Sequence, residues 1–243
     1  MRTFVFAKRN IIEIIRDPIT VFFGLCFPII ILLLLTLLQS NIPVDMFQIE
    51  KLAQGIAVFG LSFMSLFSGM LIAKDRTSSF LIRLYSSPAK PYEFILGYVL
   101  PFVPLSVIQS IVCFAVSAIL GLKISINIMY AVLAIIPVSL FYIGIGILCG
   151  SFLTDKQVGG ICGALLTNIS AWLSGIWFDL SLMGETLERI AYMLPFANAV
   201  EFVRGIINNN FDIKPALIIF LYSMAVLAAA ILVFSSKMRS DKN

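Results

Sequence analysis

The side chains that most often carry out chemistry are scarce in this sequence. It contains no histidine, which removes histidine-based nucleophilic catalysis, proton relays and metal sites. Its four cysteines form no CxxC pair, and all of them lie within long apolar stretches: Cys26, Cys113, Cys149 and Cys162. We expect them to be small buried side chains rather than a disulfide framework or a metal site.

Motifs for nucleotide chemistry are missing as well. There is no GxxxxGK[ST] sequence, so we do not expect the chain to bind and hydrolyse ATP itself. Gly144, Gly146 and Gly150 are spaced GxGxxxG, which departs from the dinucleotide fingerprint. We interpret Gly146 and Gly150, and likewise Gly159 and Gly163, as small-residue packing faces of membrane helices. The sequence therefore predicts no enzyme activity, no cofactor and no metal in this chain.

The composition points to a membrane protein. Of the 243 residues, 60% are hydrophobic and 12% are charged, whereas soluble domains carry about 25% charged residues. This excludes a soluble enzyme, a disordered chain and a nucleic-acid-binding domain, so we expect no nucleic-acid partner. The predicted fold is an all-α integral membrane domain.

A membrane-crossing helix needs about 20 apolar residues. Six stretches without Asp, Glu, Lys or Arg are long enough: residues 19–38, 52–73, 94–122, 124–153, 158–178 and 215–236. None of the 13 carboxylates lies within them, which argues against an ion-coupled carrier. Most of the 17 basic residues fall on the side of both termini, which predicts that the termini are cytoplasmic and accounts for the net charge of +4.

The first 18 residues predict an amphipathic helix that lies on the membrane, because Phe4 shares an apolar face opposite Arg9 and Arg16. We expect its basic residues, including Lys8, to lie near anionic lipid. The helix is either a simple membrane anchor or an elbow that also touches a cytoplasmic partner. Pro18 marks the turn into the first span.

The cytoplasmic segment 74–93 is the densest basic stretch. Apolar side chains recur four residues apart within it, which predicts a short helix. Aromatic and arginine side chains dominate protein interfaces, so this helix is either a docking surface or lies on the lipid. Its candidate contact residues are Arg76, Phe80, Leu81, Arg83, Leu84 and Tyr85.

The spans contain aromatic and weakly polar side chains, which suit a large amphipathic cargo, although helix packing explains the serines and threonines equally well. The candidate pathway residues are Phe59, Phe63, Phe67, Asn168, Trp172 and Trp177. Residues 190–200 are too short to cross, so residues 179–213 predict a re-entrant hairpin that is either an exit gate or an ordinary outer cap. The candidate gate residues are Pro195, Phe196, Glu201 and Arg204.

Three motifs follow one another along the chain: Arg16-Asp17-Pro18, the basic run from Lys74 to Pro88, and Ser174-Gly175-Ile176-Trp177-Phe178 followed by Leu194-Pro195-Phe196. Together they resemble the membrane subunits of bacterial ABC exporters of the ABC-2 type. The chain departs from the family's loop motif where Ser78-Ser79 stand for Gly-Thr, Ile82 for glutamate and Tyr98 for lysine.

The resemblance implies a half-transporter in the bacterial cytoplasmic membrane, with residues 19–236 as its transmembrane domain and 237–243 as a cytoplasmic tail. A second copy or a homologous permease and two ATPase subunits, which bind ATP and Mg, would complete it. Residues 74–93 would hold the coupling helix, and a path between the second and fifth spans would carry a drug or an antimicrobial-peptide-like compound outward. The alternatives are a lipid-linked polysaccharide exporter, a non-transporting scaffold or sensor, and an ion-coupled carrier.

Overall fold

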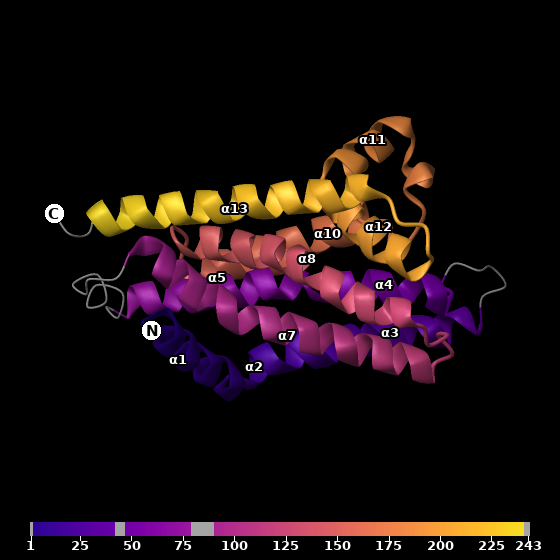
Figure 1. The fold of residues 1–243 in the computed structure, drawn as a ribbon, viewed down its shortest axis with the longest axis horizontal. Helices are drawn as coiled ribbons and strands as arrows, with labels where there is room; N and C mark the ends of the chain where they lie inside the picture. Colours follow the sequence, from indigo (N-terminus) through magenta and orange to yellow (C-terminus); the bar gives the residue numbers. More distant parts are fainter. Residues whose placement is uncertain (1, 42–46, 79–89, 241–243) are drawn as a thin grey trace.

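The computed structural model describes residues 2–41, 47–78 and 90–240. Within these ranges the chain forms helices and no strand, and the long helices lie side by side in one bundle (Figure 1). The predicted all-α membrane class is confirmed. We call the end that holds the last turns of α5 and α13 the terminal end, and the end that holds α11 and α12 the hairpin end.

The N-terminal helices turn at the predicted proline. Helix α1 (Arg2–Arg16) stops one residue before α2 (Pro18–Val21), and the Asp17 carboxylate caps α2 by accepting a hydrogen bond from the Ile19 amide at 3.1 Å. Helix α2 continues through the π-helical turn η1 (Phe22–Cys26) into α3 (Phe27–Gln39). These three segments form the first apolar span.

The next three spans agree with the predicted positions. Helices α4 (Ile49–Gly60) and α5 (Ser62–Thr77) form one span with a break at Leu61, and this span is the most buried of the candidates. Helices α7 (Pro91–Ile119) and α8 (Ile126–Gly150) are joined by a tight turn. Gly121 has φ +112° in this turn, a conformation that glycine adopts without strain.

The fifth predicted span is shorter than expected. Segments α9 (Asp155–Val158), η2 (Gly159–Leu166, π-helical) and α10 (Thr167–Leu173) form it, and the helix ends before Gly175, whose φ is +70°. After η3 (Leu180–Met183), helices α11 (Glu185–Met193) and α12 (Pro195–Ile207) are bent by 77° to each other, and α13 (Ile213–Ser240) follows.

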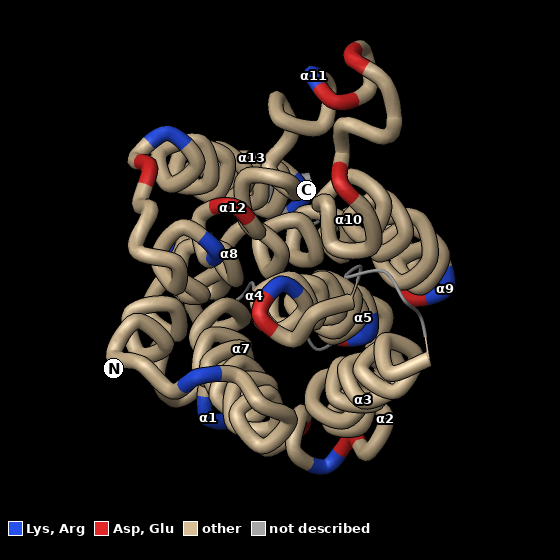
Figure 2. The backbone as a smooth tube through the Cα atoms, turned by 90° about the vertical axis from the view of Figure 1, so that its right-hand side faces the viewer, with Lys and Arg blue, Asp and Glu red and all other residues tan. Residues whose placement is uncertain are grey.

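Five helices of the described chain are long and apolar enough to cross a membrane, or six if the bent α11–α12 pair counts as one span. The fifth predicted stretch, residues 158–178, is not among the five, and its helix starts with the charged pair Asp155 and Lys156. Seen along the bundle, α4 and α5 lie near its middle (Figure 2).

Helices α5 and α8 approach each other closely because glycines stand where they cross. A Cβ on Gly146 would overlap the Ser65 carbonyl oxygen, and one on Gly150 would overlap the carbonyl oxygen of Gly69. The predicted small-residue face of the fourth span is therefore a packing surface. On the fifth span Gly163 packs on a leucine side chain, but Gly159 faces open space, so only half of that predicted face packs.

Candidate functional site at the terminal end of the bundle

A buried carboxylate lies at the terminal end. Asp75 is on the last turns of α5, and its side chain is 2% exposed. Arg9 of α1 binds it with two hydrogen bonds, Nη1 to Oδ2 at 2.5 Å and Nη2 to Oδ1 at 2.7 Å. The Tyr98 hydroxyl of α7 donates to the same Oδ2 at 2.8 Å. A paired guanidinium in this two-point geometry is among the strongest hydrogen-bonded contacts in proteins.

The neighbouring residues of α1 complete the contact with α7. Asn10 is fully buried, donates to the Gly97 carbonyl oxygen at 3.0 Å and accepts from Arg9 at 2.8 Å. Phe6 packs edge-on against the Tyr98 ring, with the centroids 4.9 Å apart, in space that a side chain on Gly97 would fill. We call Arg9, Asn10, Asp75 and Tyr98 the Arg9–Asp75 cluster.

The electrostatics of this cluster favour the charged pair. Burial alone lowers the pKa of Arg9, but the hydrogen bond to Asp75 and the attraction of its charge raise that pKa above its ordinary value. Glu13 adds a second ion pair to Arg9 at 2.6 Å. The guanidinium therefore stays protonated at every physiological pH, and the cluster is a permanent link between α1, α5 and α7.

The residue after Asp75 links α5 to another helix. Arg76 donates to the carbonyl oxygens of Ser151 at 2.8 Å and Leu153 at 2.6 Å, beyond the last turn of α8. A cation at a helix C-terminus satisfies carbonyl groups that lack partners within the helix. Residues 75 and 76 thus attach the end of α5, just before the undescribed segment 79–89, to α1, α7 and α8.

Arg76→Ala is expected to lower the free energy of unfolding by about 1.5–3 kcal/mol, because two carbonyl groups lose a charged donor. Equilibrium unfolding in detergent micelles measures this loss. Arg189→Ala is the matched control, since Arg189 makes an exposed pair with Glu185 at the hairpin end, and such pairs contribute about 0–1 kcal/mol. Equal losses in both variants would contradict the role of Arg76.

The predicted docking residues divide between described and undescribed parts of the chain. Arg76 has the contacts above, whereas the others lie outside the described residues: Phe80, Leu81, Arg83, Leu84 and Tyr85. On α1, Phe4, Lys8 and Arg16 are exposed. Arg9 differs from the expectation of a lipid contact, because it binds Asp75 of the same chain.

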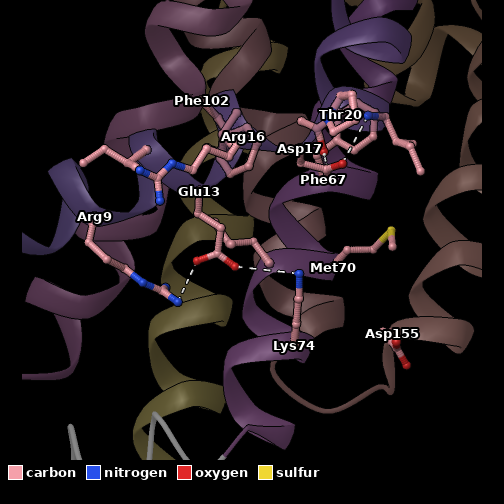
Figure 3. A pocket seen from close by; sticks show the side chains of 15 residues that line it. Arg9, Glu13, Arg16, Asp17, Thr20, Phe67, Met70, Lys74, Phe102 and Asp155 are labelled. Atoms are coloured by element: carbon pink, nitrogen blue, oxygen red, sulfur yellow. Dashed lines mark hydrogen bonds and ion pairs between the residues drawn. The ribbon is translucent and has the colours of Figure 1, made fainter.

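The six pathway residues do not lie in one place. Phe59, Asn168, Trp172 and Trp177 line a cavity of about 530 Å³, and the rings of Phe59 and Trp177 are 5.9 Å apart. Phe63 instead packs edge-on against Phe27 at 5.2 Å. Phe67 borders a different cavity, of about 600 Å³, which lies between α1, α2, α5, α7 and α9 (Figure 3).

The candidate gate residues anchor the bent pair. Pro195 starts α12, and Phe196 is buried against Phe141, with ring centroids 6.0 Å apart. Glu201 and Arg204 form an ion pair at 2.7 Å. The bend between α11 and α12 lies at Leu194, next to the candidate gate residue Pro195, and the role of this pair as a gate stays a prediction.

Sequence reasoning missed the Arg9–Asp75 cluster. It placed Asp75 at the start of a loop, whereas α5 continues to Thr77 and buries this carboxylate. One signal was present, since Asn10 interrupts the buried side of α1 between Ala7 and Ile14. In the described ranges, no three His, Cys, Asp or Glu residues are arranged to hold a metal ion.

A comparison with protein-family models finds one match over most of the chain. The model described as ABC-2 type transporter matches residues 1–208. This range includes the Arg9–Asp75 cluster, both cavities and the bent helix pair. No curated protein was found that matches the chain.

Proposed function

The chain belongs to the ABC-2 type transporter family, and from this premise we propose that it is the permease half of an ATP-driven exporter for amphipathic compounds. It is a multi-pass membrane component of an ABC transporter and associates with an ABC ATPase; it is not itself the catalytic subunit. In the proposed complex, two ATPase subunits bind ATP and Mg, and two permeases form the pathway in the cytoplasmic membrane of a bacterium, with the termini on the cytoplasmic side.

The observation that carries this proposal is the fixed end of α5. Asp75 and Arg76 attach it to α1, α7 and α8, immediately before residues 79–85, which lie outside the described ranges and which we propose as the contact with the ATPase. A movement imposed on that segment by an ATPase would reach three helices through short, charge-assisted contacts. Transmission through packed and hydrogen-bonded elements is what coupling between two sites requires.

The α4 end of the α4–α5 span supports the proposed cargo path. Helix α5 packs against η2, so the second and fifth helical runs are neighbours. Where α4 meets α10, the 530 Å³ cavity is lined mainly by aromatic side chains, with Asn168 and Thr167 as polar groups. Its size and lining are typical of sites for amphipathic small molecules.

The first test is co-purification. The chain is co-expressed with its candidate ABC ATPase, only the permease carries a tag, and the ATPase per permease is measured in the eluate. We expect equimolar recovery. Leu84→Asp is expected to reduce it about 30-fold, because an interface anchor contributes 2 kcal/mol or more.

Leu182→Asp is the matched control, since Leu182 is 74% exposed near the hairpin end and is expected to leave ATPase recovery unchanged. Recovery of as much ATPase with Leu84→Asp as with the unchanged chain would contradict the coupling-helix assignment. ATP hydrolysis by the complex is then measured with and without amphipathic compounds. Hydrolysis that no cargo stimulates would favour the scaffold alternative.

A further inference from the structure

The 600 Å³ cavity between α1 and α5 lies where the surface helix meets the first span. Its wall includes the junction of α1 and α2 around Asp17 and Pro18. When the span that starts at Pro18 crosses a membrane, this junction lies at the level of the lipid headgroups. The volume is in the range of specific small-molecule sites.

Cationic and acidic groups are balanced on this wall. The charged lining residues are Arg9, Arg16, Lys74, Glu13, Asp17 and Asp155. Several of them already have strong partners. Arg9 binds Asp75, Glu13 binds Arg9 at 2.6 Å, and Asp17 accepts from the Ile19 amide and the Thr20 hydroxyl.

Two cations, Arg16 and Lys74, and one carboxylate, Asp155, lack a strong ionic partner among the described residues. Arg16 of α1 is exposed and forms no ion pair with any described residue, and Lys74 of α5 is held only loosely, 3.9 Å from Glu13. Asp155 accepts a hydrogen bond from the Lys156 amide at 2.9 Å and pairs with no cation in the described ranges. Figure 3 shows Arg16 and Asp155 on different sides of the cavity, with Lys74 between them.

The remaining wall is apolar. Phe67, Met70 and Leu71 of α5 and Phe102 of α7 line it, and Met70 is 40% exposed there. A ligand that complements this wall carries an anionic group, a cationic hydrogen-bond donor and an apolar chain.

We propose that this cavity binds one phospholipid with a primary ammonium head, of the phosphatidylethanolamine type. Arg16 and Lys74 contact the phosphate, Asp155 accepts from the ammonium, and the acyl chain lies on Phe67 and Met70. A trimethylammonium head has no N–H to donate to Asp155, and a glycerol head leaves Asp155 without a cation. The proposal depends on the chain crossing a membrane, and not on the export function.

Native mass spectrometry of the full chain in detergent tests this site. The chain is titrated with phosphatidylethanolamine, phosphatidylcholine or phosphatidylglycerol of identical acyl chains. We expect about tenfold tighter retention of the first lipid, because one charge-assisted hydrogen bond distinguishes it from phosphatidylcholine. Free phosphoethanolamine is expected not to displace it, since it lacks the acyl chain.

Asp155→Asn is expected to abolish the preference over phosphatidylcholine, and Arg16→Gln to weaken retention of all three lipids. The matched controls are Glu185→Gln and Lys214→Gln, exposed residues toward the hairpin end that should change neither quantity. Equal retention of the three lipids, a preference for phosphatidylglycerol, or displacement by free phosphoethanolamine would each overturn the proposal. Because no ATPase takes part, these outcomes are independent of the export test.

Discussion

Arg9→Met is expected to destabilise the protein by about 3–5 kcal/mol, the loss typical of breaking one side of a buried ion pair. The variant leaves the Asp75 carboxylate 2% exposed and facing the Tyr98 hydroxyl. Asp75→Asn is expected to cost less, since the Arg9 side chain is 36% exposed and keeps Glu13 at 2.6 Å. The free energy of unfolding in mixed micelles measures both losses.

The double variant Arg9→Met/Asp75→Leu distinguishes the loss of the ion pair from the cost of leaving the Asp75 carboxylate buried without a cation. It is expected to recover most of the stability that Arg9→Met loses, because no buried carboxylate remains without its cation. Arg16→Met is the matched control on the same helix, and as an exposed residue it should change stability by about 0.5 kcal/mol or less. Equal losses in Arg9→Met and Arg16→Met would show that the cluster does not hold α1.

The second large effect is expected at the crossing of α5 and α8. Gly146→Ala should lower the free energy of unfolding by about 3 kcal/mol, near the upper end for overpacked cores. The new methyl group would overlap the Ser65 carbonyl oxygen, which is backbone and cannot rotate away. The two helices must separate along their contact to make room. Unfolding in micelles and the monodisperse fraction after purification measure the result.

Gly159→Ala is the matched control for this substitution, because nothing lies within 4 Å of a Cβ at that position. It is expected to leave stability unchanged or slightly raised. Adding Ser68→Ala to Gly146→Ala should not rescue the protein, since truncating the hydroxyl leaves the Ser65 carbonyl in place. Rescue by Ser68→Ala would show that a side chain, rather than the backbone, limits the approach of the helices.

Local features of the sequence predicted the parts of the fold that local chemistry determines. Apolar runs located the five helices of the described chain that are long enough to cross a membrane, Pro18 marked the end of α1, and the turn between α7 and α8 contains Gly121. The break between α11 and α12 lies at Leu194, next to the predicted Pro195. In each case a proline, a glycine or a change in polarity acts within a few residues of the boundary that it sets.

Contacts between residues far apart in the chain could not be predicted from these local features. Asp75 was expected in a loop because it is charged, yet α5 continues past it to Thr77, and Arg9, 66 residues earlier, neutralises its charge. Gly146 and Gly159 begin identical small-residue spacings, but only Gly146 meets a neighbouring helix. Spacing describes one helix, whereas the partner that a face meets depends on how the whole bundle packs.

The Arg9–Asp75 cluster also sets an order of events during biosynthesis. Helix α1 leaves the ribosome first, but its partners Asp75 and Gly97 follow 66 and 87 residues later. Until the end of α5 has been translated, the Arg9 guanidinium must stay in water or among headgroups, because its buried acceptor Asp75 does not yet exist, and the acceptor of Asn10 follows only with the start of α7. Docking of the N-terminal helix is thus the step that closes the first half of the bundle, and it comes after insertion of the first two spans.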